Sequence, residues 1–242
     1  MIPIYPDNCI QSLIKPSSWW EKTKTKVLER GRLIWAFLPH VDQIPYELIP
    51  TGRVSPTNHT TCVVKIEAID IKKPAPTKTL PLAALPQYPG ERYIVQRAKR
   101  RPALVVSAQP PAVEEDVRRG FPRSQTNPHV LVAPYYGAVG SNKRGGFAKK
   151  LIQRVRLCFY PQFMWDRLPI SNEESILRFD HIQPVGVHHQ SIEITEYRLG
   201  EDALDIVDEW IEWLKSGKLD ENAIIYEARG ELLRTIRLDT PA

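Results

Sequence analysis

The chain has 242 residues, of which 42% are hydrophobic and 25% charged, with 3 cysteines and a formal net charge of +5. These proportions are typical of a folded globular protein, and they exclude an intrinsically disordered chain and a disulfide-rich scaffold. No apolar run approaches the roughly 20 residues that span a bilayer, so we expect no membrane partner and a cytoplasmic location.

Hydrophobic runs predict five core strands along the chain. They cover residues 32–38, 92–97, 103–107, 130–135 and 176–185. Many of the 22 prolines fall between the first two of these strands. Because proline removes backbone donors, we interpret residues 39–90 as a proline-rich insertion, with one strand of its own at 61–69.

The later part of the chain contains the clearest helix signal. Apolar residues recur at helical spacing over 201–215, and Gly217 can end this helix in a left-handed conformation. Residues 152–168 fit a strand or a helix, and so do residues 223–238. We predict a single domain over 1–242 whose C-terminal extension is 217–242. Short strands with one late helix favour a small barrel with helices packed outside it.

The segment Arg100-Arg101-Pro102 joins two cations to the predicted strand 103–107. Proline disfavours helical backbone in the residue before it, so Arg101 should be extended at the mouth of a rigid strand. A planar guanidinium held there can bind a phosphate. The alternative is an ordinary solvated charge at a strand start.

Further basic residues lie before and after the central strands. Lys99 and Arg100 precede strand 103–107, and Lys143 and Arg144 lie in a flexible segment after strand 130–135. Such a distribution favours a basic face that binds the RNA backbone. A set of unrelated solvated side chains is the alternative.

Four segments, taken in chain order, carry a resemblance to a known family. They are Gly31-Arg32-Leu33-Ile34-Trp35-Ala36-Phe37, Arg100-Arg101-Pro102-Ala103-Leu104-Val105-Val106-Ser107, Val130-Leu131-Val132-Ala133-Pro134-Tyr135-Tyr136-Gly137 and Ser175-Ile176-Leu177-Arg178-Phe179-Asp180-His181-Ile182-Gln183-Pro184-Val185. In this order, and followed by the helix at 201–215, they resemble the MazF/PemK toxin ribonucleases. The resemblance implies a mainly β fold with packed helices, an SH3-like small barrel, and a homodimer.

The resemblance also implies a chemistry. These toxins cut single-stranded RNA without a metal or cofactor, by attack of the ribose 2′-hydroxyl on the adjacent phosphate. Arg101 matches the arginine that stabilises the charge on the phosphate. Tyr136 stands where the family has a threonine or serine. Its hydroxyl can donate a hydrogen bond to a phosphate, and its ring can stack on a base.

Other candidate groups are weaker. His181 can act as an acid or base near neutral pH, although histidines are often merely packed. His188 and His189 lack partners at zinc-ligand spacing, so we expect no metal site. We therefore predict a metal-independent endoribonuclease of a toxin–antitoxin pair, whose partners are RNA and an antitoxin protein. The alternative is a catalytically inactive SH3-like barrel that binds RNA or a peptide.

Overall fold

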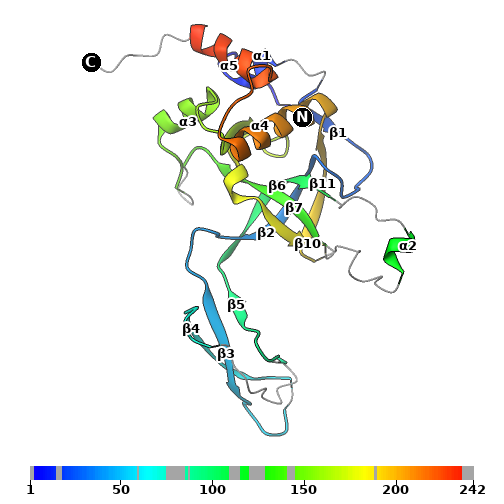
Figure 1. Cartoon of the computed structure of the whole chain (residues 1–242), viewed down its shortest axis with the longest axis vertical. Helices are drawn as coiled ribbons and strands as arrows, with labels where there is room; N and C mark the ends of the chain where they lie inside the picture. The colour runs from blue at the N-terminus through cyan, green and yellow to red at the C-terminus, as the bar shows by residue number, and fades with distance from the viewer. Residues whose placement is uncertain are drawn as a thin grey trace. The chain divides into compact units, whose positions relative to one another are not determined.

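A computed structural model describes residues 3–14, 18–58, 60–74, 85–86, 88–108, 115–119, 129–140, 145–187 and 190–235 (Figure 1). Strands hold 35% of the residues and helices 23%, which confirms the prediction of a mainly β protein with a few helices. The chain divides into two compact units. The main unit comprises residues 1–38 and 100–242, and the second unit comprises residues 39–99.

The main unit is built on one large sheet. Its strands pair in the order β1-β11-β2-β6-β7-β9-β8, and β10 pairs with β7 outside this path. Their bounds are Trp20–Lys22 (β1), Ile192–Leu199 (β11), Arg32–Pro39 (β2), Ala98–Ser107 (β6), His129–Gly137 (β7), Glu174–Arg178 (β9), Phe163–Arg167 (β8) and Gln183–Gly186 (β10). Within the described residues the two end strands do not pair, so the sheet is open and the expected barrel is not closed.

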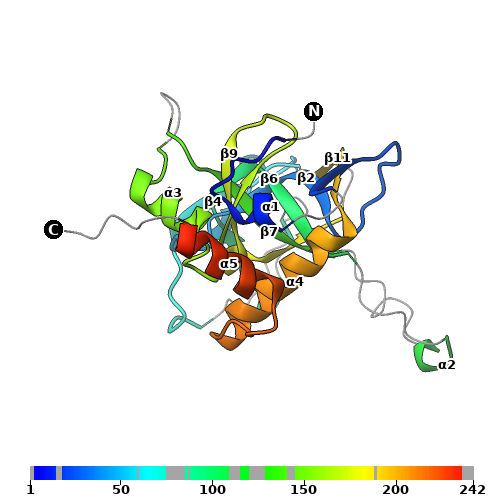
Figure 2. The ribbon, with the colours of Figure 1, turned by 90° about the horizontal axis from the view of Figure 1, so that it is seen from above.

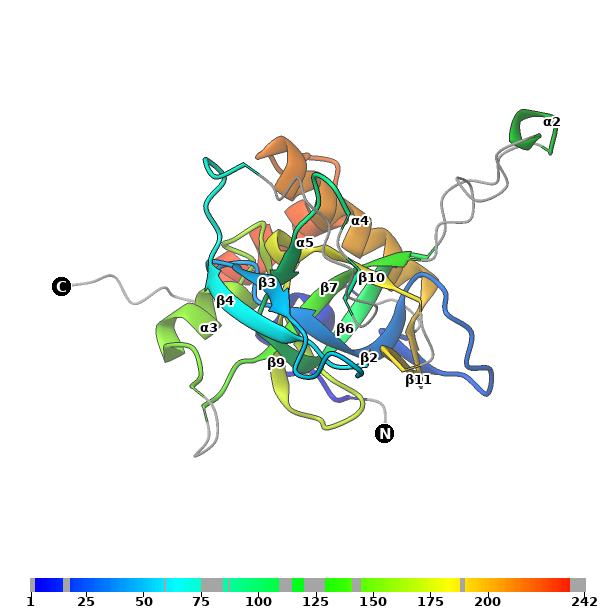
Figure 3. The same ribbon diagram turned by 90° about the horizontal axis from the view of Figure 1, so that it is seen from below.

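The long strand β7 pairs with three other strands of the sheet. Its residues 131–134 pair with β6. Residues 129–132 also pair with β10, while Tyr135, Tyr136 and Gly137 pair with β9. One strand thus has neighbours in two directions, and Figure 3 shows β6, β7 and β10 lying together.

The central strands are buried on both faces, which accounts for their continuous apolar sequences. On one face, Leu33 and Leu104 belong to the core cluster that includes the helices. On the other face, Ile34 and Val105 belong to a second cluster, formed by strands alone. The sheet therefore separates two apolar layers.

Helices cover one of these layers. Helix α4 (Glu201–Ser216) buries Ile206 and Trp210, and it ends at Gly217, which has a φ of 71°. The predicted helix and its left-handed cap are both confirmed. Helix α5 (Ile224–Thr235) packs against α4 and against the N-terminal helix α1 (Ile10–Leu13), as Figure 2 shows. The undecided segment 223–238 is thus helical as far as residue 235.

Three sequence expectations need correction or completion. The segment 152–168 contains both alternatives, because helix α3 (Lys149–Arg156) ends before strand β8 begins. The strand predicted at 176–185 is two strands, β9 and β10, joined by a 3₁₀ turn at Phe179–His181. The core strand predicted at 92–97 is wrong, because β5 (Tyr93–Val95) pairs with β3 of the second unit.

The second unit is a three-stranded antiparallel sheet. Strand β3 (Tyr46–Gly52) lies between β4 (Val63–Ala68) and β5. The strand predicted at 61–69 is therefore present. Glu47 is buried on one face, where its carboxylate lies 2.6 Å from the guanidinium of Arg92.

A short helix, α2 (Glu115–Arg118), lies in the polar connection between β6 and β7. Among the helices that the structure describes, none is long and apolar enough to cross a membrane.

Candidate functional site

Arg101 and Tyr136 are brought together by the pairing of β6 with β7. The antiparallel register sets Ala103 opposite Pro134, and two residues further along each strand Arg101 faces Tyr136. The guanidinium carbon of Arg101 lies 4.0 Å from the centre of the Tyr136 ring. Both side chains are half-buried. The two residues predicted to act on the phosphate are therefore neighbours on the sheet.

His181 lies against Tyr136 from the 3₁₀ turn that joins β9 to β10. Its Nδ1 is 2.9 Å from the Tyr136 hydroxyl oxygen, and the two rings meet edge to face with centres 5.6 Å apart. Only 7% of His181 is exposed, so its imidazole is packed as well as hydrogen bonded. His181, the weaker candidate from the sequence, thus contacts Tyr136, the stronger one.

Arg178, at the end of β9, reaches the other nitrogen of the same imidazole. One guanidinium nitrogen of Arg178 is 2.6 Å from His181 Nε2. A guanidinium only donates, so Nε2 must accept this bond and Nδ1 must carry the ring proton. His181 then donates to the Tyr136 oxygen, and the hydroxyl hydrogen of Tyr136 is not used in that bond.

Asp180 holds Arg178 in place. The Arg178 Nε donates to one carboxylate oxygen of Asp180 at 2.8 Å, and a terminal nitrogen donates to the other oxygen. Such a two-bond pair fixes the plane of the guanidinium. The guanidinium carbon of Arg178 also lies 5.6 Å from the Tyr136 ring centre.

These five residues, Arg101, Tyr136, Arg178, Asp180 and His181, are called the Arg101 cluster below. With a neutral imidazole the cluster contains two cations and one anion, so its net charge is positive. It also contains a hydroxyl and an imidazole that can pass protons. Cleavage of a phosphodiester uses positive charge and hydrogen-bonding groups of this kind. The reaction adds negative charge to the phosphate and moves protons at two oxygens.

Sequence reasoning did not select Arg178 or Asp180, and the reason is geometric. In the continuous strand predicted at 176–185, His181 would face away from both, because strand side chains alternate. The 3₁₀ turn at Phe179–His181 removes that alternation. The signal available in the sequence was the run Arg178-Phe179-Asp180-His181 itself.

Two of the four residues proposed to bind the RNA backbone, Lys99 and Arg100, are described by the structure, and neither belongs to the Arg101 cluster. Arg100 forms an ion pair with Glu193, and its guanidinium carbon lies 4.5 Å from the Trp35 ring centre. Lys99 is exposed on β6. Lys143 and Arg144 lie outside the residues that the structure describes.

A second polar cluster surrounds Asp166 on β8, whose carboxylate is fully buried. The hydroxyls of Tyr5 and Tyr135 each donate to its carboxylate at 2.9 Å, and Trp20 Nε1 donates at 3.2 Å. Burial raises the pKa of Asp166 to about 6, although these hydrogen bonds act in the opposite direction. Because Asp166 is 0% exposed, we assign this cluster to stability.

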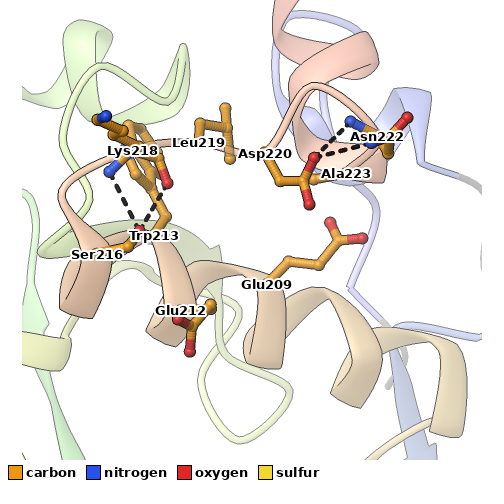
Figure 4. A pocket seen from close by; sticks show the side chains of 9 residues that line it. All are labelled: Glu209, Glu212, Trp213, Ser216, Lys218, Leu219, Asp220, Asn222 and Ala223. Carbon is orange, nitrogen blue, oxygen red and sulfur yellow. Dashed lines mark hydrogen bonds between the residues drawn. The ribbon is translucent and has the colours of Figure 1, made fainter.

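A hollow of about 420 Å³ lies beside α4 and the start of α5 (Figure 4). Two of its acidic residues already bind other groups of the protein. Glu209 accepts from the backbone amides of Ile224 and Ile225 at 3.0 and 3.1 Å, and Glu212 forms an ion pair with Lys215. None of the lining residues belongs to the Arg101 cluster.

Among the described residues, no group of three His, Cys, Asp or Glu side chains is arranged to hold a metal ion. Comparison with known proteins adds no family assignment: no family model, no curated protein and no solved structure matches the chain. The geometry of the Arg101 cluster is therefore the basis for a functional proposal.

Proposed function

We propose that the protein is a metal-independent endoribonuclease of the MazF/PemK toxin type, active in the cytoplasm on single-stranded RNA. Its main unit would be an SH3-like fold with an open sheet, acting as a homodimer and neutralised by an antitoxin protein. The observation that carries the proposal is the stack of Arg101 on Tyr136, whose hydroxyl lies 2.9 Å from His181.

In this proposal the two arginines of the cluster bind the scissile phosphate. Attack by the 2′-hydroxyl adds negative charge to the phosphate oxygens, and a fixed guanidinium stabilises that charge. Arg101 is positioned by the Tyr136 ring, and Arg178 by the two hydrogen bonds to Asp180. The products are a cyclic phosphate and a free 5′-hydroxyl.

Tyr136 and His181 act on the phosphate as a hydrogen-bonded pair. His181 is buried, so it can act on the reacting oxygens only through Tyr136, which is half-buried. This hydroxyl accepts a hydrogen bond from Nδ1 of His181 and donates one to an oxygen of the phosphate. The bond from His181 thus orients the Tyr136 hydroxyl, which stabilises the charge on the phosphate as a hydrogen-bond donor.

The test is an RNA cleavage assay with chemical analysis of the ends, run with a metal chelator present. Arg101→Ala should lose about 100-fold or more in cleavage rate, as the loss of one charge-stabilising donor typically does. Arg100→Ala is the matched control, because the neighbouring arginine contacts Glu193 and Trp35 instead. Equal rates for wild type and Arg101→Ala would refute the assignment.

One observation favours a second function, a non-catalytic module that binds RNA or a peptide. A tyrosine occupies the position where the resembled family has a smaller hydroxyl residue, and its ring already stacks on Arg101. A ring and a guanidinium together can bind single-stranded RNA by stacking. Wild-type protein that binds RNA without cleaving any would support this function over the first.

A further inference from the structure

The outer edge of β4 in the second unit is a candidate contact surface. β4 is an end strand of its sheet, which has the order β4-β3-β5 in the part of the chain that the structure describes. Val64 is 38% exposed and Ile66 is 57% exposed. An end strand presents unpaired backbone groups, which can pair with another strand.

The two faces of this sheet differ in charge. The register places Tyr46 and Leu48 opposite Ala68 and Ile66, and opposite Val95 and Tyr93 on the other side. One face, called the apolar face below, is thus formed by Tyr46, Leu48, Val64, Ile66, Tyr93 and Val95. The opposite face contains the charged residues Lys65 and Glu67 of β4, together with Glu47, Ile49 and Ile94. Any strand that extends the sheet must match this alternation.

We propose that the outer edge of β4 binds the same edge of a second copy of this chain. The two strands run antiparallel about a twofold axis at Ile66. Ile66 then faces its own copy, and Val64 faces Ala68 of the other chain. Directly opposite residues of antiparallel strands share one face of a sheet. The apolar faces of the two copies therefore continue into each other.

The charges of Lys65 and Glu67 favour an axis at Ile66 over an axis at either adjacent residue. With the axis at Ile66, Lys65 of each copy faces Glu67 of the other, which gives two opposite-charge pairs. An axis at Lys65 would set two lysines face to face, and an axis at Glu67 would set two glutamates face to face. A slip by one residue in the pairing would place Val64 opposite Glu67 and mix the two faces. Like charges directly opposite each other are unfavourable.

In a single chain, Lys65 and Glu67 already form an ion pair along the strand. The side chain of Lys65 is 64% exposed in that pair, so it can turn to a partner at small cost. The contact joins two three-stranded sheets into one of six strands. Interfaces that use the same patch on both copies form closed dimers. A contact through one pair of strands is small, so we expect a dimer of moderate affinity.

Charge reversal tests the contact on the full-length protein, by light scattering across micromolar to millimolar concentrations. Wild type should approach the mass of a dimer. Glu67→Lys or Lys65→Glu should each weaken the dimer by about tenfold or more, because every cross-strand pair becomes repulsive. An equimolar mixture of the two variants should regain the dimer, since each lysine then faces a glutamate. If the main units also pair, as the homodimer of the proposed function requires, the single variants should have half the wild-type mass. A monomeric wild type, or the same mass in wild type and both single variants, would overturn the proposal.

Disulfide trapping tests the twofold axis directly. Opposite residues in antiparallel strands have Cα atoms about 4.5–5.5 Å apart, which is within the range of a disulfide. With Cys62→Ser as background, Ile66→Cys should cross-link two copies on oxidation. Val64→Cys should not, because Val64 faces Ala68 of the partner. Equal cross-linking by both variants would contradict the proposed axis. Neither experiment measures RNA cleavage, so failure here and failure of the proposed activity are distinguishable.

Discussion

The guanidinium carbon of Arg101 lies 4.0 Å from the centre of the Tyr136 ring, so the cation rests on the face of the aromatic system. This contact uses the ring, whereas the contact with His181 uses the hydroxyl. Cation–π attraction orients the guanidinium without the hydroxyl. The two functions of Tyr136 can therefore be separated by mutation.

Tyr136→Phe removes the hydroxyl and keeps the ring. If the hydroxyl donates to the phosphate, its loss removes a hydrogen bond to a charged group, which is worth roughly 1.5–3 kcal/mol. Cleavage should then fall by about 10- to 150-fold. Binding of RNA should fall less, because the bond strengthens mainly in the transition state. Single-turnover rates and RNA affinities measure the two effects.

Tyr226→Phe serves as a control for that change, because Tyr226 is an exposed tyrosine on α5. Tyr136→Ala adds a second comparison. In a binding module without catalysis, Tyr136→Phe would be almost silent, and Tyr136→Ala would weaken RNA binding by about 1–3 kcal/mol through lost stacking. That pattern would contradict the catalytic function.

His181→Ala and His181→Asn distinguish proton transfer from positioning. Asparagine keeps an N–H donor toward Tyr136 but has no ring nitrogen that can exchange a proton. If His181 orients the Tyr136 hydroxyl by donating to it, His181→Ala should lose about tenfold or more in cleavage rate, and His181→Asn should keep most of the rate. An equal large loss in both variants would indicate proton transfer instead. Recovery of wild-type cleavage by His181→Asn would show that the histidine only orients Tyr136. Circular dichroism should accompany the rates, because His181 is buried.

The helix at 201–215 and the strands around Leu33, Leu104 and Val132 could be predicted because their local patterns agree with their final burial. Arg101 could also be named from the sequence, because it precedes a proline and an apolar run, whereas Tyr136 was named from the resemblance to the MazF/PemK toxins. Strand pairing that joins distant segments could not be read from local patterns. That is why β5 was placed in the wrong sheet.

The cluster around Asp166 shows a different limit of sequence reasoning. Its donors come from Tyr5, Trp20 and Tyr135, which are far apart along the chain. Nothing in the residues beside Asp166 distinguishes a buried carboxylate from a solvated one. Only the packing of the N-terminal segment against β8 creates the site, so it follows from the fold alone.

Asp166→Asn should change how stability depends on pH. Burial raises the pKa of the folded-state carboxyl to about 6, from an ordinary value of 3.8. Between these values the unfolded chain ionises while the folded chain stays protonated, so wild-type stability falls as pH rises from about 4 to 6. The total loss is roughly 3 kcal/mol, at 1.36 kcal/mol for each pKa unit.

The asparagine variant has no carboxyl to ionise at this position and should lack that fall. Urea unfolding at pH 4 and pH 7 gives the free energy of unfolding of both proteins. From pH 4 to pH 7, the variant should gain roughly 3 kcal/mol relative to wild type. Asp205→Asn provides a control on the exposed side of α4. A parallel pH dependence in wild type and Asp166→Asn would show that the carboxyl is not perturbed by burial.

Glu209→Ala should destabilise the protein by about 0.5–2 kcal/mol, as the loss of a helix cap does. The carboxylate of Glu209, on α4, accepts from the first two backbone amides of α5, which otherwise have no partner within that helix. Glu212→Ala, one turn along on the same helix, removes only an exposed ion pair and should change stability by less. Chemical unfolding of both variants compares them, and equal losses would argue against the cap.

The contact between α1 and α5 has a consequence for how the protein is made. Ile10 and Trp20, near the start of the chain, share one core cluster with Ile225 and Leu232, near its end. A ribosome releases the early residues long before the late ones, so this core cannot form until residues as late as Leu232 have emerged. Arg101, Tyr136 and His181 are synthesised well before that moment. The sheet that aligns them gains its full support only when α5 is in place, so a truncated chain should not present an assembled cluster.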